Sequence, residues 1–246
     1  MLSELEKIVD RYVDRPCDIT PMSAVPDRDR LRIGPAVAQV EATALSIDIR
    51  QFTGMTNALG RQVMVKMLKA FFEGSVALVS ANQGVVADFN GDGMITLFTG
   101  SDRTERAFLT ASQIGWFIDE SLRPKFARFF ERVGVPFRRI DQFDAGCGID
   151  DGLVLIARVG TEAFSDIAWV GRCVNSAAKL CKAADATKAT IVTHEVYERL
   201  DSAPFAHEVK WLPAEDVEVG GVRRTTAATS YRCAPSTAES GRSRMD

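Results

Sequence analysis

The chain has 246 residues, of which 46% are hydrophobic and 26% charged, an ordinary globular composition that suffices for one large domain or two small ones. A formal net charge of −3 leaves no basic face for polymeric nucleic acid, although a small anionic ligand needs only a few local cations. No apolar run approaches the roughly eighteen residues of a membrane span, and residues 1–15 lack the apolar core of a signal peptide. We therefore expect a soluble, cytoplasmic protein without a membrane span or a nucleic-acid polymer as partner.

The number and spacing of the cysteines predict that they are reduced thiols. They are odd in number and show no C-x-x-C spacing, which argues against a disulfide framework and a structural zinc site. They are Cys17, Cys147, Cys173, Cys181 and Cys233.

The N-terminal segment reads as a helix followed by an arm. Apolar residues recur at helical spacing over residues 2–13, which predicts a short amphipathic helix that ends before Pro16 and whose exposed face could serve a dimer. Prolines and charges then alternate as far as residue 41, as in an extended arm. We divide the chain into an N-terminal helix and arm (1–39), a catalytic domain (40–233) and a tail (234–246), which its low apolar content predicts to be disordered.

The catalytic domain alternates strands and helices. The sequence ATALSIDI predicts a strand over residues 42–49, and the helical pattern that follows predicts one long helix over 53–80. Two apolar runs around NGDG predict a hairpin over 84–98, and a second helix is predicted over 102–123.

The second half of the domain begins with two predicted short strands around Asp150-Asp151-Gly152, which we interpret as a turn. The later predicted elements are a segment 164–171 leading into a helix over 174–183, a strand at 189–194, a helix at 194–200 and a hairpin over 211–233. This order is that of a ferredoxin-like split βαβ core. The predicted fold class is α+β, with a mixed or antiparallel sheet and helices on one face.

Two aspartates stand out against this background. Asp48 ends an apolar strand, where a carboxylate costs desolvation unless something pairs with it, and Asp92 lies in a turn that could sit beside it in the same sheet. Converging carboxylates, with Gly91 and Gly93 permitting close approach, suit a hard divalent cation and phosphate oxygens. The same NGDG sequence is also a strong hairpin turn, so a purely structural role for Asp92 is equally open.

Four ordered motifs carry a family resemblance. They are DIRQFT from Asp48, NGDGMITLF, AGCGIDDGLVLIARVG, and VGRCVNSAAK from Val170. In order and spacing they resemble the class III nucleotidyl cyclases over residues 40–233. The resemblance implies a nucleoside triphosphate substrate and a head-to-tail homodimer with two active sites at the shared interface.

The resemblance also implies roles for particular residues. Asp48 and Asp92 would hold two divalent cations per site, Mg²⁺ or Mn²⁺, with the Ile49 carbonyl as a further ligand. Asn175 of the partner subunit would orient the ribose. The phosphates would be held by the turn that carries three further predicted substrate-binding residues, Arg50, Phe52 and Thr53.

The chain departs from the family at the positions that read the base. Where relatives place lysine for adenine or glutamate for guanine, this chain has Asp88, and the second base-reading position is Ala168. A carboxylate accepts hydrogen bonds only, so Asp88 suits guanine N1 and N2, cytosine N4 or uracil N3, and offers nothing to adenine N1.

Two further departures concern charge. Lys179 stands where the family has the catalytic arginine. A lysine keeps the positive charge but loses the bidentate hydrogen-bonding geometry of the guanidinium group. The family lysine that holds the triphosphate falls at Val219, which leaves Arg223 or Arg224 as substitutes.

The resemblance and its departures together suggest a cyclase that uses a pyrimidine nucleotide, UTP or CTP, as some bacterial cyclases do to make an antiphage signal. A guanylate cyclase is the second hypothesis and an adenylate cyclase a weaker one. A degenerate domain that binds nucleotide or a partner without turnover is the third.

Overall fold

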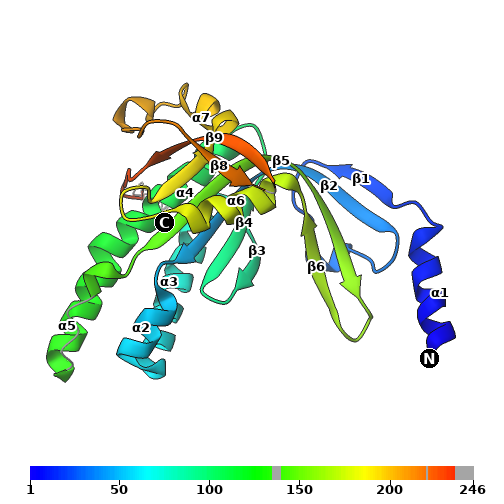
Figure 1. Cartoon of the computed structure of the whole chain (residues 1–246), viewed down its shortest axis with the longest axis horizontal. Helices are drawn as coiled ribbons and strands as arrows, with labels where there is room; N and C mark the ends of the chain where they lie inside the picture. The colour runs from blue at the N-terminus through cyan, green and yellow to red at the C-terminus, as the bar shows by residue number, and fades with distance from the viewer. Residues whose placement is uncertain (135–139, 220, 236–246) are drawn as a thin grey trace, which may run out of the picture.

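The computed structural model describes residues 1–134, 140–219 and 221–235, with the exception of the Asp141 side chain (Figure 1). The predicted disordered tail lies, from residue 236 onward, outside the described residues. The domain boundaries stay a prediction, although the central strand begins at Ala36, a few residues before the predicted start of the catalytic domain.

A mixed sheet forms the centre of the molecule. Its main path runs β3-β4-β2-β5-β7-β9-β8, while β1 pairs with β2 and β6 pairs with β5. The β2–β4 and β2–β5 ladders are antiparallel, and the β5–β7 and β1–β2 ladders are parallel. The strands are β1 (Asp18–Met22), β2 (Ala36–Ile49), β3 (Val85–Asn90), β4 (Gly93–Phe98), β5 (Ala145–Gly160), β6 (Ser165–Val170), β7 (Thr190–Thr193), β8 (Glu215–Val219) and β9 (Val222–Thr229).

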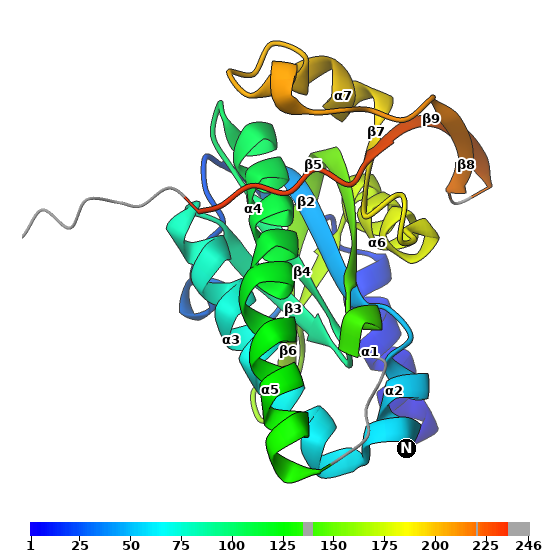
Figure 2. The same ribbon diagram turned by 90° about the vertical axis from the view of Figure 1, so that its left-hand side faces the viewer.

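Helices cover both faces of this sheet (Figure 2). The α-helices are α1 (Leu2–Val13), α2 (Phe52–Leu59), α3 (Arg61–Ala81), α4 (Arg103–Phe117), α5 (Arg123–Val133), α6 (Arg172–Ala183) and α7 (His194–Leu200). Leu45 and Ile47 of β2 pack in the large core with α3, α4 and α7, whereas Ala42 and Ala44 pack in a second core with α6. Because successive side chains of a strand point to opposite faces, a strand buried this continuously needs cover on both. The α+β class and the mixed sheet are confirmed, and α6 adds a layer on the face that the prediction left bare.

The predicted helix over 53–80 is in fact two helices. Gly60 separates α2 from α3 with φ +78°, a conformation that costs glycine little and other residues much. The second predicted helix ends later than expected. It continues from α4 through a π-helical segment, Ile118–Leu122, into α5, because Pro124 falls in the first turn of α5, where proline is tolerated.

The interpretation of Asp150 and Asp151 as a turn was wrong. The motif lies inside β5, a single strand of 16 residues, and both aspartates are buried. Asp150 is completely buried, and its carboxylate accepts hydrogen bonds from Thr193 Oγ1 at 2.8 Å and from Arg224 Nη1 at 2.8 Å. A second bond, 2.6 Å from Arg224 Nη2 to Glu195 Oε1, ties the same guanidinium to α7.

Asp151 is neutralised in the same way. Its carboxylate accepts hydrogen bonds from Thr43 Oγ1 at 2.6 Å and Arg103 Nε at 2.7 Å, and Arg199 Nη1 lies 2.9 Å from it. These arginines come from α4 and α7, so the two carboxylates join the helices to the middle of the sheet. Partners distant in sequence thus allow acids to occupy a strand interior.

The cysteines are free thiols, as expected. Burial raises the pKa of the Cys147 thiol to about 12 and of the Cys173 thiol to about 11, and it raises that of Cys181 as well. Cys17, between α1 and β1, is exposed. Helix α1 is confirmed, and it has no buried residue.

Replacing Asp150 by alanine should lower the free energy of unfolding by about 3 kcal/mol, because Arg224 is left as a buried charge with one partner fewer. The matched control is Asp166→Ala: that side chain is 80% exposed and lies 3.8 Å from Arg28, so the loss should stay under about 0.5 kcal/mol. Urea denaturation measures both. Equal losses would contradict a structural role for the buried pair.

Candidate active site

The two predicted metal ligands meet at the end of β2. Asp48 pairs with Gly93 in the β2–β4 ladder, and the Ile49 amide donates to the Asp92 carbonyl at 3.1 Å, which fixes the turn beside the strand end. A Cβ atom on Gly93 would lie 2.8 Å from Asp48 Oδ1 and 2.8 Å from the Ile47 carbonyl oxygen. Only glycine at position 93 leaves room for the Asp48 carboxylate. The pairing of β2 with β4 therefore places Asp48 beside the turn that carries Asp92.

The electrostatics of this pair favour a cation. Burial raises the pKa of Asp48, the negative charge of Asp92 raises it further, and the Lys182 ammonium partly offsets both effects. Ionised Asp48 is therefore under-compensated in the protein alone, and a bound cation would relieve that cost.

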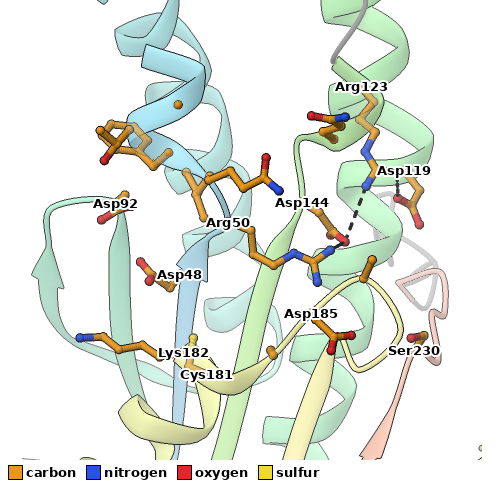
Figure 3. Close-up of a pocket in the computed structure, with 18 of the residues that line it drawn as sticks. Asp48, Arg50, Asp92, Asp119, Arg123, Asp144, Cys181, Lys182, Asp185 and Ser230 are labelled. Carbon is orange, nitrogen blue, oxygen red and sulfur yellow. Dashed lines mark hydrogen bonds and ion pairs between the residues drawn. The ribbon is translucent and has the colours of Figure 1, made fainter. Parts of the chain in front are cut away.

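A cavity of about 980 Å³ opens in front of the carboxylates (Figure 3). Six of the predicted site residues line it: Asp48, Ile49, Arg50, Phe52, Thr53 and Asp92. Gln51 takes a left-handed conformation with φ 56°, which turns the chain from β2 into α2. The amides of the first turn of a helix have no intrahelical acceptor, so this turn can donate to an anion.

The far wall of the cavity is a network of arginines and aspartates that the sequence did not reveal. Asp144 is buried; its carboxylate accepts a hydrogen bond from Arg50 and one of 3.1 Å from Arg232 Nη2, and Arg123 Nη2 lies 3.7 Å away. Arg123 also donates to Asp119 at 2.6 Å. The only local signal for this network was an acid, Asp144, directly before strand β5. Two of its arginine partners are distant in sequence, because Arg123 begins α5 and Arg232 follows β9.

The remaining predicted site residues do not line this cavity. Asn175 and Lys179 are exposed on α6, one turn apart. Asp88 is exposed on β3, which ends the main path of the sheet, and follows a register shift at Ala87. Ala168 is half-buried on β6.

The two arginines proposed from sequence to replace the family lysine also lie outside the cavity. Arg223 is exposed on β9. Arg224 is held by Asp150 and Glu195, and this pairing occupies its guanidinium. Val219 is buried in a small apolar cluster, so nothing at this position reaches a phosphate.

Asp48 and Asp92 could share a divalent cation only with help from other oxygens. In the described part of the chain, no group of three or more His, Cys, Asp and Glu side chains is arranged to hold a metal. Carboxylates that leave positions open for a carbonyl, water or phosphate are the usual arrangement for Mg²⁺. None of the helices in the described ranges is long and apolar enough to cross a membrane.

Comparison with curated proteins finds uridylate cyclases among the relatives. The chain is 28% identical over 177 residues to a uridylate cyclase of Rhodovulum sp., which covers 72% of each protein. A uridylate cyclase of Burkholderia cepacia is 26% identical over 224 residues, covering 89% of this chain and 94% of that protein. No family model matches the sequence.

Solved structures with the same fold include cyclase domains. A bacterial light-regulated adenylyl cyclase aligns with a TM-score of 0.66 at 20% identity over 80% of this chain, which spans about half (53%) of that protein. A guanylyl cyclase aligns with a TM-score of 0.64 at 19% identity, covering 81% of this chain and 96% of that one.

The fold and these relatives agree with the resemblance carried by the four motifs: the chain has the fold of nucleotidyl cyclase domains and is similar in sequence to uridylate cyclases. The resemblance thus fits the pyrimidine cyclase group, because these relatives are uridylate cyclases.

Asp48→Asn should raise the melting temperature of the metal-free protein at pH 7. A raised pKa means that ionised Asp48 destabilises the fold, so the wild type loses stability as pH rises through that pKa while the variant does not. Added Mn²⁺ should raise the melting temperature of the wild type and leave the variant unchanged. Thermal scans at several pH values with and without Mn²⁺ measure both effects, and an equal response to Mn²⁺ would argue against this cation site.

Proposed function

We propose that the protein is a metal-dependent cyclase that converts a pyrimidine nucleoside triphosphate, UTP before CTP, to the 3′,5′-cyclic monophosphate and pyrophosphate. The observation that carries the proposal is that Asp48 and Asp92 line one large cavity beside the N-terminus of α2, whose first amides have no intrahelical acceptor. The cyclic product would act as a second messenger in bacterial antiphage defence, as the resemblance to pyrimidine cyclases suggests.

The chemistry required of the site is in-line attack of the ribose 3′-oxygen on the α-phosphorus, with pyrophosphate leaving. Asp48 and Asp92 would hold two Mg²⁺ or Mn²⁺ ions, with the Ile49 carbonyl as a further ligand. Bound there, the ions supply Lewis acidity toward the 3′-hydroxyl and the phosphate oxygens. The amides of Phe52 and Thr53 in the first turn of α2 would hold the phosphates in line, whereas the Arg50 amide donates to the Asp144 carbonyl at 2.9 Å.

The rest of the site would come from a second copy of the chain. Asn175 and Lys179 are exposed on one face of α6 and do not line the cavity of their own subunit, which supports a head-to-tail homodimer in which they act across the interface. There Asn175 would orient the ribose, and Lys179 would stabilise charge on the transferring phosphoryl group. Exposed apolar side chains on the β5–β6 hairpin, including Phe164 and Val170, are further support for a covered interface.

Base selection would rest on Asp88 and Ala168. The exposed position of Asp88 on β3 suits a role in the partner's site, where its carboxylate accepts the N3–H hydrogen of uracil. Ala168 adds no polar contact, and this favours a base that needs few.

A guanylate cyclase is the second candidate, because a carboxylate at Asp88 can also accept from guanine N1 and N2. A degenerate domain that binds without turnover is the third: one structural neighbour is described as an adenylyl cyclase-like ATP-binding protein. Lys179 in place of arginine is the feature that favours it.

The purified protein, incubated with Mn²⁺ and ATP, GTP, CTP or UTP in separate reactions, should yield a cyclic pyrimidine nucleotide, resolved by mass. Asp92→Ala should lower turnover at least about a hundredfold because it removes a metal ligand, without dissociating the dimer. Cyclic GMP alone would favour the second candidate, and no product from any of the four would favour the third.

Mixing two inactive variants tests the shared site. Asp92→Ala and Asn175→Ala should each be inactive, whereas a mixture that exchanges subunits should recover about a quarter of the wild-type activity, because half of the dimers then contain one intact site of two. Turnover after mixing is the measurement. Failure of these variants to complement, with exchange verified by size and mass, would contradict active sites assembled from both subunits.

A further inference from the structure

A triphosphate carries several negative charges, and the cavity must offer cations beyond the metals to bind it. Four basic side chains line the cavity: Arg50, Arg123, Lys182 and Arg232. The three arginines are held by the buried Asp144 and by Asp119, as described above. Each of these guanidinium groups is therefore paired with at least one carboxylate of the far wall, although Arg50 Nη1 is buried without a hydrogen-bond partner among the described residues.

Lys182 is different. Within the described ranges its ammonium group has no hydrogen bond or ion pair, and the residue is exposed at the end of α6. It nevertheless lies close enough to Asp48 to lower the pKa of that carboxyl. It is thus an uncommitted cation beside the metal-binding pair.

The position of Lys182 suits a phosphate contact. It lines the main cavity and also a second hollow of about 290 Å³ that is bounded by Asp48, Asn90 and Asp92. Figure 3 shows its side chain beside Asp48, across the cavity from Arg123. A substrate held at the two carboxylates would therefore have this cation in the lining of the same cavity.

We propose that Lys182 binds the triphosphate of the substrate in cis, in the same subunit that supplies Asp48 and Asp92. Lys182 would then supply the positive charge that the family takes from a lysine at the position of Val219, which is buried here. Arg224 cannot supply that charge, because Asp150 and Glu195 hold its guanidinium group. The inference rests on the proposed function, because it presumes a triphosphate at the metal site.

The first test compares Lys182→Gln with wild type. We expect KM for UTP to rise roughly tenfold with kcat nearly unchanged, since a hydrogen bond to a charged group commonly contributes this much. Lys182→Arg should recover most of the loss. Lys210→Gln, an exposed lysine outside the cavity, is the matched control and should match the wild type. An unchanged KM in an active Lys182→Gln protein overturns the proposal and leaves the proposed function intact.

Binding without turnover gives a second readout. With Ca²⁺ in place of Mg²⁺, Lys182→Gln should bind UTP roughly tenfold more weakly than wild type and bind UMP equally well, whereas a purely structural change would weaken both. If the wild type forms no cyclic product, this comparison still decides the role of Lys182. A wild type that binds no triphosphate overturns both this inference and the proposed function.

Subunit mixing separates cis from trans. Asp92→Ala/Lys182→Gln mixed with Asn175→Ala should recover activity with the wild-type KM, because the one intact site then takes Asp48, Asp92 and Lys182 from the same chain. Asp92→Ala mixed with Asn175→Ala/Lys182→Gln should recover activity with the raised KM. The opposite pattern would assign Lys182 to the partner's site and overturn the proposal.

Discussion

Strand β2 lies between two antiparallel partners, and this double ladder determines where the chemistry can occur. Register places Asp48 between Gly93 of β4 and Gly146 of β5, two residues without side chains. A carboxylate in that position has room on both sides, and it has Asp92 as its neighbour across the turn. Any slip of register by one residue would turn Asp48 toward the opposite core. The register that stabilises the sheet therefore also determines where the site lies.

The same sheet explains why acids recur in otherwise apolar strands. Asp150 and Asp151 lie inside β5 because arginines from α4, α7 and β9 reach them, and these pairs join the middle of the sheet to two helices and to strand β9. Asp144, at the start of β5, does likewise for the cavity wall. Carboxylates with fixed arginine partners organise the fold, while the pair at the end of β2 lacks such partners and is left available to a cation.

Local patterns predicted most of the elements, including the hairpin around NGDG, the strand that carries Asp48 and helix α1. They failed where distant partners decide: Asp150-Asp151-Gly152 has the composition of a turn, and only arginines far along the chain make it a strand. The convergence of Asp48 and Asp92 could be anticipated because both lie at strand ends. The presence of Arg123, Arg232 and Lys182 at the cavity could not be anticipated, because no local signal marks which helix end or which segment after a strand meets a cavity.

The thiols have a practical consequence. Cys147, Cys173 and Cys181 are buried with raised pKa values, and the pKa of Cys233 is raised to about 11. Maleimide reagents attack the thiolate, so at neutral pH they should modify Cys17 almost alone. That residue joins α1 to β1, and two copies would carry one probe each. A spin label on Cys17 would report the distance between the N-terminal helices of two assembled chains without an engineered cysteine.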